Sequence, residues 1–257
     1  MGVTSLENHV YLLRANKSTE QIEVYDVESY HLQHRLTVPG FDSAGDIIAC
    51  EHNHCAYVSD VSQMCVHRVP LAGGADAITK WPAGDLPTRL SHSDSPGVLV
   101  TCSLVRKIKE FSTDGELLRE VILPDGVLSP WLAVQLFSGF RVCHGAVNDP
   151  VHRVCLISSD GTVVKSYGGP KGAGTQQLDV PMHMAVDDMG FVFVADVNNC
   201  RVVLLSPSLQ YIREVVSMKQ LYPCTLHLDS LRHRLYVATN ESKDGKYTSG
   251  RVIVVDV

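Results

Sequence analysis

The sequence predicts an all-β fold, a six-bladed β-propeller in which each blade is a small sheet of four antiparallel strands. Two observations lead to this prediction. A pattern of short apolar strands recurs six times at intervals of about 42 residues. Asp-Gly pairs also stand where tight hairpin turns are needed between strands.

One segment shows the repeating unit most clearly. Residues 182–216 divide into four short strands, expected at 182–186, 191–196, 201–206 and 211–216. Apolar residues dominate the first two strands, as is typical of strands that are covered on both faces. We therefore expect these two to lie nearest the centre of the molecule.

The centre of the second strand recurs along the whole chain. It is found at Leu12, Val58, Val100, Val142, Val194 and Val237, which are 46, 42, 42, 52 and 43 residues apart. Six such units are what a six-bladed propeller requires. We expect one domain over residues 1–257, with blades at about 1–40, 41–82, 83–124, 125–169, 177–218 and 219–257.

Turn and loop residues support this division. Asp114-Gly115 and Asp160-Gly161 fall between the third and fourth strands of their units, which predicts type I′ turns. The long step of 52 residues contains the Gly-rich segment 168–181 and the segment 145–152. Both are expected to be enlarged loops.

The repeat also predicts how the ring closes. Aligned on the other units, the chain begins inside the first strand of blade one and ends with the third strand of blade six. Blade six should therefore lack its outermost strand, and blade one should close the ring by packing alone. The bare edge of blade six is exposed to association. This edge suggests that the chain is a fragment, or one domain, of a longer parent.

Residues 50–55, Cys-Glu-His-Asn-His-Cys, place two thiols and two imidazoles close together. The repeat assigns this stretch to the tight turn between the first two strands of blade two. A zinc site needs ligands that converge tetrahedrally, whereas the residues flanking a short hairpin point to alternate faces. We predict a structural turn and no metal site, although adventitious binding at His52 and His54 stays open.

Composition limits the classes of function. The chain of 257 residues has 45 % hydrophobic and 19 % charged residues and a net charge of −6, which argues against an indiscriminate polyanion binder. No apolar run approaches the ~18 residues of a membrane span. The first residues lack the features of a signal peptide, and the eight cysteines form no CxxC pair. We expect a cytoplasmic protein with free thiols and neither membrane nor DNA partners.

Residues 168–207 resemble an NHL repeat. The matches include Pro181, Asp187, Gly190, Asn199 and the pair Asp196 and Arg201, while His183 replaces the usual glycine. The other five units keep the period but little of the motif. The chain thus resembles the C-terminal NHL propeller of tripartite-motif (TRIM-NHL) proteins. We expect Asp196 and Arg201 to form a structural ion pair across the loop between the second and third strands.

The resemblance implies a binding face made by the loops between second and third strands and those between blades. The position of His183 on the innermost strand recurs as Ile47, Arg89, Trp131 and Thr225. Arg89, Trp131 and His183 would then surround the channel mouth, with side chains that binding hot spots favour. Alternatively, Trp131 packs between blades and Arg89 pairs with an acid. Nearby loops add Trp81, Lys107, His144, Lys171 and Tyr222.

Three classes of function fit these residues. The first is a non-enzymatic scaffold that binds a protein partner, as the substrate-binding part of a ubiquitin-ligase-like tripartite-motif parent would. The second is a propeller that binds single-stranded RNA through basic and aromatic side chains. The third is a metal-dependent propeller lyase or hydrolase with His183 and His144 near the channel. The sequence has no GxSxG, HExxH or P-loop motif, and we favour the first class, with no cofactor.

Overall fold

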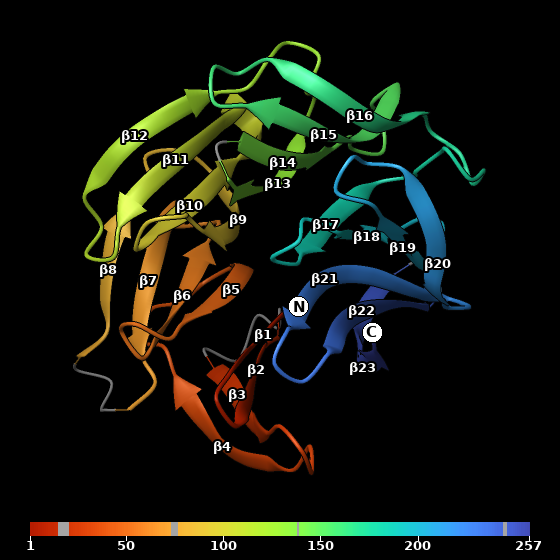
Figure 1. Ribbon diagram of the computed structural model, residues 1–257. Coiled ribbons are helices and arrows are strands. Elements are labelled where there is room, and N and C mark those ends of the chain that lie inside the picture. Colours follow the sequence, from red (N-terminus) through yellow and green to blue (C-terminus); the bar gives the residue numbers. More distant parts are fainter. Residues whose placement is uncertain (15–20, 73–76, 138, 244–245) are drawn as a thin grey trace.

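The protein is a ring of six antiparallel sheets arranged around a common centre (Figure 1). The computed structural model describes residues 1–14, 21–72, 77–137, 139–243 and 246–257. Within each sheet the strands follow one another as hairpins, so neighbours in sequence are neighbours in space. This arrangement confirms the predicted six-bladed β-propeller.

The first three blades each contain four strands. Blade one consists of β1 (Gly2–Leu6), β2 (His9–Leu13), β3 (Gln21–Asp26) and β4 (Leu32–Thr37). Blade two consists of β5 (Ala44–Cys50), β6 (Cys55–Asp60), β7 (Cys65–Pro70) and β8 (Thr79–Pro82). Blade three consists of β9 (Pro87–His92), β10 (Gly97–Cys102), β11 (Lys107–Ser112) and β12 (Leu117–Ile122), with a short 3-10 turn at Ser103–Val105.

The last three blades differ in strand number. Blade four consists of β13 (Pro130–Leu136), β14 (Gly139–His144), β15 (Val151–Ser158) and β16 (Val163–Pro170). Blade five consists of β17 (Pro181–Val186), β18 (Val192–Asp196), β19 (Arg201–Leu205) and β20 (Tyr211–Ser217). Blade six has only β21 (Leu221–Asp229), β22 (Arg234–Lys243) and β23 (Lys246–Asp256). The predicted three-stranded last blade is confirmed.

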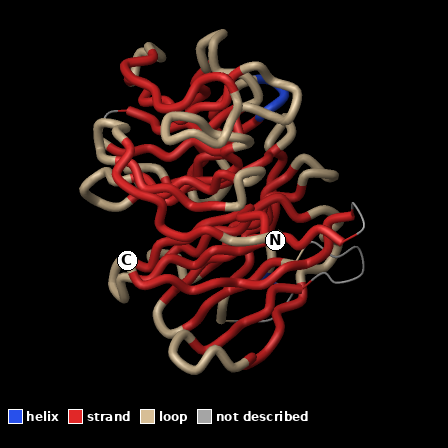
Figure 2. Tube along the Cα trace, turned by 90° about the vertical axis from the view of Figure 1, so that its right-hand side faces the viewer, coloured by secondary structure: helices blue, strands red, loops and turns tan. Residues whose placement is uncertain are grey.

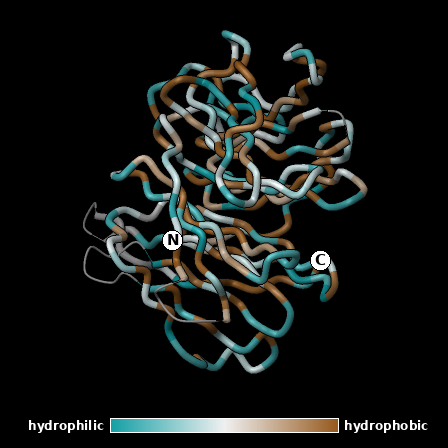
Figure 3. The backbone as a smooth tube through the Cα atoms, turned by 90° about the vertical axis from the view of Figure 1, so that its left-hand side faces the viewer, coloured by the Kyte–Doolittle hydropathy of each residue, from teal (hydrophilic) through white to brown (hydrophobic). Residues whose placement is uncertain are grey.

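The core lies between adjacent blades. Leu132 and Cys143 of blade four pack against Met184, Val194 and other residues of blade five, and similar clusters join the other neighbours. Figure 2 shows the strands running through the molecule with loops at their ends, and Figure 3 shows hydrophobic segments recurring along those strands. Among the described residues, no helix has the length and apolar character needed to span a membrane.

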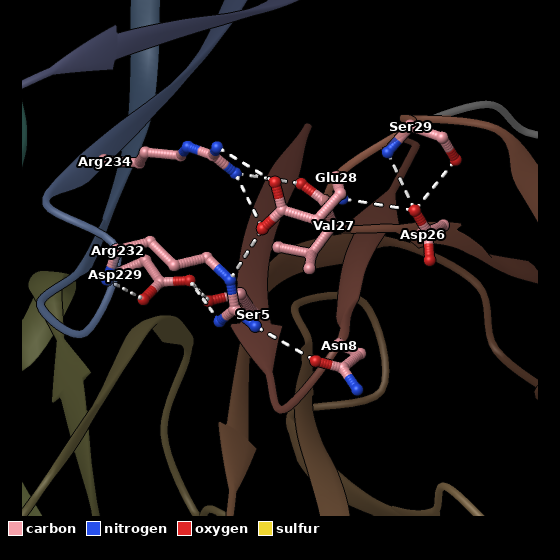
Figure 4. Close-up of polar contacts among 9 residues, drawn as sticks. All are labelled: Ser5, Asn8, Asp26, Val27, Glu28, Ser29, Asp229, Arg232 and Arg234. Carbon is pink, nitrogen blue, oxygen red and sulfur yellow. Dashed lines mark hydrogen bonds and ion pairs between the residues drawn. The ribbon is translucent and has the colours of Figure 1, made fainter.

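The ring closes between blades one and six by apolar packing and a polar clamp. Val3 and Val10 pack with Tyr236 and Ala238. At the surface, Glu28 accepts hydrogen bonds from both Arg232 (3.2 Å) and Arg234 (3.1 Å), as Figure 4 shows. The prediction of closure by packing alone was therefore incomplete.

Further contacts hold this clamp in place. Arg232 also donates to Asp229 (3.2 Å) and to the side-chain oxygen of Asn8 (3.1 Å). Ser5 donates to Asp229 (3.3 Å) from the innermost strand. Figure 4 shows these side chains reaching across the gap between the first and last blades. Because no strand pairing joins these sheets, the side chains link the two ends of the chain.

The predicted type I′ turns are wrong. In the turn of blade three, the Gly115 amide donates to Ser112 O (3.1 Å), and Gly115 has φ +91° while Asp114 is not left-handed. The Ser112 amide in turn donates to Glu116 O (2.8 Å). This is a three-residue turn with a Gly bulge, in which the extra residue adds the twist that the strands need. The turn at Gly161 is built in the same way.

Candidate functional site

The innermost strands of four blades contain a proline followed by a bulged residue, at the first position of β9, β13 and β17 and at the third position of β21. Pro87, Pro130 and Pro181 each pair with the last residue of their blade's second strand, and Pro223 pairs with Thr239 within β22. In each case the register then skips one residue. The skipped residues are Thr88, Trp131, Met182 and Cys224. Proline is tolerated here because it is the first residue of the strand in three of these blades and stands next to a bulge in all four, and the bulge re-aims the following side chain.

This bulge corrects the predicted register of blade four. Trp131 occupies the position of Met182, and Leu132 occupies the position of His183, because Leu132 pairs with Cys143 as His183 pairs with Ala195. The sequence alignment placed Trp131 one residue out of step. Alignment on the four prolines, at steps of 43, 51 and 42, would have found the correct register.

The bulged residues of blades four, five and six line a single cavity of about 590 Å³. It lies at the end of the ring where second strands turn into third strands and where successive blades are connected. We call it the mouth cavity. Its lining residues are Ser129, Trp131, Ala146, Val147, Asn148, Asp149, Val180, Met182, Val197, Asn198, Tyr222, Cys224 and Asn240.

Trp131 forms one wall of the mouth cavity. Its indole Nε1 donates to Gly145 O at 3.2 Å, and its ring packs against the core between blades four and five. Gly145 has φ +112°, and a Cβ there would lie 2.6 Å from Val151 O. Glycine is therefore required at the residue that anchors the indole. An indole held in this way presents a rigid apolar surface with its polar group already satisfied.

The loop of blade four that borders the cavity is fixed by a buried histidine. His152 is fully buried; its Nε2 lies 2.9 Å from Ala146 O, and its Nδ1 accepts a hydrogen bond from the Val180 amide at 2.9 Å. Asp149 accepts from the Ala146 amide at 2.7 Å. The loop before blade five is thus tied to the loop within blade four, so the cavity walls are preformed.

Asp196 and Arg201 form the predicted ion pair, at 2.8 Å, and both are buried. Arg201 also donates to the carbonyl oxygens of Ala173, Gly174 and Gln177 in the Gly-rich loop. Asp196 accepts from the Asp179 amide (2.7 Å) and from Asn199 (2.8 Å). The pair therefore holds the connection between blades four and five.

Of the binding-face residues predicted from sequence, the structure brings Trp131 and Tyr222 together in the mouth cavity. Trp81 was wrongly placed. It is buried, with its ring 5.7 Å from that of Tyr57, in the core between blades two and three. As part of the outermost strand β8, it packs inward instead of reaching the loops.

His144 is also not on the surface. It is fully buried at the end of β14, with Nε2 3.4 Å from Cys155 Sγ. Burial lowers the pKa of His144 to about 4, so the imidazole is neutral near pH 7. The end of the second strand lies beneath the loops, which is why this position cannot offer a side chain to a ligand.

Arg89 is committed to the fold. Its Nη1 donates to Gly45 O (2.5 Å) and to Thr88 O (3.2 Å). Burial by itself would raise the pKa of Asp46, but His183, Arg89 and the Leu90 amide together hold it below the usual value. The alternative interpretation is thus met only in part, because Arg89 lowers the pKa of Asp46 but donates its hydrogen bonds to backbone carbonyls.

Lys107 and Lys171 lie outside the mouth cavity. Lys107 is half-buried at the start of β11 and pairs with Glu120 at 2.8 Å. Lys171 is exposed in the Gly-rich loop. Basic groups therefore do not converge on the mouth cavity, and Asp149 is the only charged residue among those that line it.

The central channel forms a second cavity, of about 340 Å³, toward the opposite face. His183 lines it together with two histidines that the repeat did not single out, His92 and His227. His183 Nε2 lies 3.5 Å from Asp46, and His227 Nε2 lies 2.8 Å from the Ser5 hydroxyl. Within the described part of the chain, the side chains that converge as metal ligands do are found in blade two and not in this channel.

The stretch of residues 50–55 is the hairpin turn between β5 and β6, as predicted. Cys50 pairs with Cys55 across the turn. His52 and His54 at the tip are both exposed, and they do not converge with the thiols as metal ligands would. The His54 imidazole lies 3.7 Å from Glu7. The turn stands at the opposite end of the sheet from the mouth cavity.

No protein-family model matches the sequence, and comparison with curated proteins finds no significant match. Similarity is found among solved structures. A chain of Kuenenia stuttgartiensis hydrazine synthase aligns with a TM-score of 0.68 at 14 % identity, covering 100 % of this chain and 95 % of that one. Virginiamycin B lyase from Staphylococcus aureus aligns with 0.66 at 11 %, covering 100 % and 83 %.

A chain of a nidogen/laminin complex is similar as well. It aligns with a TM-score of 0.69 at 18 % identity, covering 94 % of this chain and 92 % of that one. These structures include enzymes and a protein–protein complex. At such identities they share the propeller fold with this chain, and the fold by itself is compatible with binding or catalysis.

Proposed function

We propose that the chain is a non-enzymatic propeller that binds a protein partner at the mouth cavity. The observation that carries the proposal is the convergence of Trp131, Met182 and Tyr222 from three blades on one preformed cavity. Large aromatic side chains in a desolvated pocket are typical of binding hot spots. A cavity of this size suits one or two apolar side chains of a partner.

The polar groups of the cavity suit a peptide backbone. Asn148, Asn198 and Asn240 line its rim, and each amide side chain can both donate and accept hydrogen bonds. Asn198 is oriented by a hydrogen bond to Asp179 at 3.0 Å. The rim thus offers hydrogen bonds around an apolar floor, which is the usual arrangement of a protein-binding site.

Charge favours a protein over RNA. A phosphate backbone would require arginine or lysine side chains at the site, yet the lining residues include none. Two cations of blade three are paired with acids: Lys107 pairs with Glu120, and Arg106 pairs with Asp125 at 3.0 Å. Single-stranded RNA is therefore the second candidate, and it would have to bind elsewhere on this face.

The similarity to a chain of a nidogen/laminin complex agrees with a role in protein binding. The finer assignment, to the substrate-binding part of a tripartite-motif ligase, rests on the NHL-like segment of blade five alone. In that setting the chain would recruit a substrate in the cytoplasm, and another domain would transfer ubiquitin. Similarity to propeller lyases keeps a metal-dependent enzyme as a third candidate.

The test is selection of peptides from a random display library on the immobilised chain. We expect the selected peptides to carry a large apolar residue, and the variant Trp131→Ala to weaken their binding at least about tenfold. Val147→Asp, at a rim residue that is 59 % exposed, should do the same without disturbing the core. Leu104→Ala, an exposed residue of blade three on the same face, is the matched control and should bind normally.

Two outcomes would contradict the proposal. Peptides that bind Val147→Asp and Trp131→Ala as tightly as the wild type would place the site elsewhere. Fluorescent single-stranded RNA that binds with an affinity falling steeply between about 50 and 200 mM salt, while no peptide is selected, would favour the RNA candidate.

A further inference from the structure

Blade two contains a buried cluster of three different side chains. Asp60 ends β6, and Cys65 and His67 belong to β7. All three are buried, and one potential ligand atom from each lies within 4.8 Å of the others. Because Asp60 pairs with Cys65 across the hairpin, and His67 is two residues further on, the register itself brings the three groups to one face.

The side chains meet at a single point. His67 Nε2 lies 3.4 Å from Cys65 Sγ and 3.7 Å from Asp60 Oδ2. In a catalytic Cys-His-Asp relay, the thiol and the carboxylate would face different ring nitrogens. Here the same nitrogen faces both, which is the arrangement of ligands around a shared ion.

The distances fit a tetrahedral ion. With metal bonds of about 2.3 Å to sulfur and about 2.0–2.1 Å to nitrogen and oxygen, ligand atoms at tetrahedral angles stand about 3.4–3.6 Å apart. The observed separations, 3.4 Å between nitrogen and sulfur and 3.7 Å between nitrogen and oxygen, lie within a few tenths of an ångström of these edges. A small adjustment of the side chains would therefore complete three bonds.

The Asp60 carboxylate is held in place by hydrogen bonds, as metal-binding carboxylates commonly are. Asp60 accepts hydrogen bonds from the backbone amides of Asp42 (2.9 Å) and Gln63 (3.0 Å). Ligating carboxylates are commonly fixed by such outer contacts, which leave further lone pairs for a metal. His67 is also held in place, with its ring packed edge-on against Phe41 at 5.6 Å.

A cavity of about 170 Å³ reaches the cluster at His67. It is lined by Pro39, His67, Ile78, Thr79 and Lys80, at the edge of blade two. A water molecule could supply a fourth ligand from this side. The cavity is also a path by which an ion could enter from solvent.

The geometry points to a binding site for a divalent transition metal ion of the zinc class, held by Asp60, Cys65 and His67 with a fourth position open to the cavity. One sulfur, one nitrogen and one oxygen ligand are the mixture that Zn²⁺ accepts and that Mg²⁺ and Ca²⁺ do not prefer. On binding, the Cys65 thiol releases its proton to solvent and its sulfur bonds to the ion. No oxidation or reduction is involved.

The test uses Co²⁺ as a spectroscopic probe on the intact chain under reducing conditions. We expect one equivalent of Co²⁺ to give the visible bands of a tetrahedral complex and a thiolate charge-transfer band, and Zn²⁺ to displace it. Cys65→Ser should abolish the charge-transfer band. His67→Gln, a second variant that keeps the thiol, should weaken Co²⁺ binding by at least about tenfold.

Two control variants make the assignment specific. Cys155→Ser removes a thiol that also lies 3.4 Å from a buried histidine, His144, but without a carboxylate, and should leave the band unchanged. Cys50→Ser, in the hairpin turn with His52 and His54, should leave it unchanged as well. The inference would be overturned if the folded wild type showed no charge-transfer band. It would also be overturned if either control variant lost the band while Cys65→Ser kept it.

Discussion

Blades five and two use the same position of the repeat in different ways. Each places a buried aspartate at the end of its second strand, Asp196 in one and Asp60 in the other. The residue opposite is Arg201 in blade five and Cys65 in blade two. Blade five therefore holds a closed ion pair, whereas blade two holds an uncharged partner and leaves room for His67 to approach.

The surroundings of the two aspartates are built alike. Each carboxylate accepts a backbone amide from the incoming connection, Asp179 at 2.7 Å or Asp42 at 2.9 Å. Asn199 and Gln63 each donate to a glycine carbonyl of that connection, Gly172 and Gly40. The aspartate thus has the same structural task in both blades, which is to cap the loop that enters the blade.

The difference shows that capping the loop does not require the arginine. In blade five the guanidinium is needed because the long Gly-rich loop offers three carbonyls that must be satisfied. The connection into blade two is short, so that role is absent. In blade two the position opposite the aspartate therefore does not need an arginine and is occupied by Cys65.

The largest expected effect comes from breaking the pair of blade five. Arg201→Ala should lower the free energy of unfolding by about 3–5 kcal/mol, because it leaves the buried Asp196 charge uncompensated. Urea denaturation of the purified variant measures this. Arg213→Ala, an exposed arginine of the same blade, is the control. A loss below about 1 kcal/mol for Arg201→Ala would show that the loop is held by other contacts.

Zinc should stabilise the protein through blade two. Excess Zn²⁺ at about 100 times its dissociation constant would add about 2.7 kcal/mol, measured as a rise in thermal midpoint. Cys65→Ser should show no such rise, while Arg201→Lys should keep it because blade five is not involved. An equal rise in wild type and Cys65→Ser would mean that the ion binds at another site.

In blade four the last residue of the second strand is a titratable histidine. His144 stands where Asp196 stands in blade five, and its pKa of about 4 in the fold lies below the ordinary 6.5. Between pH 4 and pH 6.5 this histidine binds more protons in the unfolded chain than in the folded chain. The contribution of neutral His144 to the free energy of unfolding is therefore complete above pH 6.5 and is lost as the pH falls toward 4. At pH 5 the loss should be about 2 kcal/mol.

Unfolding by urea at pH 7 and pH 5 measures this contribution. The variant His144→Gln should lose less stability between the two pH values than the wild type, whatever its stability at pH 7. His34→Gln, an exposed histidine of blade one, should behave as the wild type does. Equal pH dependence in His144→Gln and the wild type would show that His144 does not titrate as its burial implies.

The smallest effect is expected in blade three. Lys107 occupies the position of Arg201, but it pairs with Glu120 at the surface, where both side chains are about 30 % exposed. Exposed pairs contribute little, so Lys107→Ala should change the free energy of unfolding by less than about 1 kcal/mol. Urea denaturation beside Arg201→Ala gives a direct comparison. A change as large as that of Arg201→Ala would contradict the importance of burial.

Local features of the fold were predictable from the sequence. The apolar centres of the second strands fixed the number of blades, because a period of about 42 residues reflects one four-stranded unit. The Asp196–Arg201 pair was predictable because its residues face one another across a short hairpin. The missing strand of blade six followed from where Val257 falls in the repeat.

The candidate sites were less predictable. Trp131 was found by residue type but placed one residue out of register, since a bulge is invisible to a fixed period unless the preceding prolines are aligned. Trp81 and His144 were placed on the surface because a repeat position does not reveal which side of a loop is covered. Met182 and Asn240 were missed because neither has a distinctive motif.

The sequence by itself determined the propeller, its six units and the three-stranded last blade, because these depend on strand-length hydrophobic patterns that repeat. Only the tertiary structure decided which side chains meet. The mouth cavity joins Trp131, Met182 and Tyr222 from three blades, and the clamp joins Glu28 to Arg232 and Arg234. Such contacts depend on how separate sheets pack around the ring, and residues far apart in sequence come together only when the ring closes.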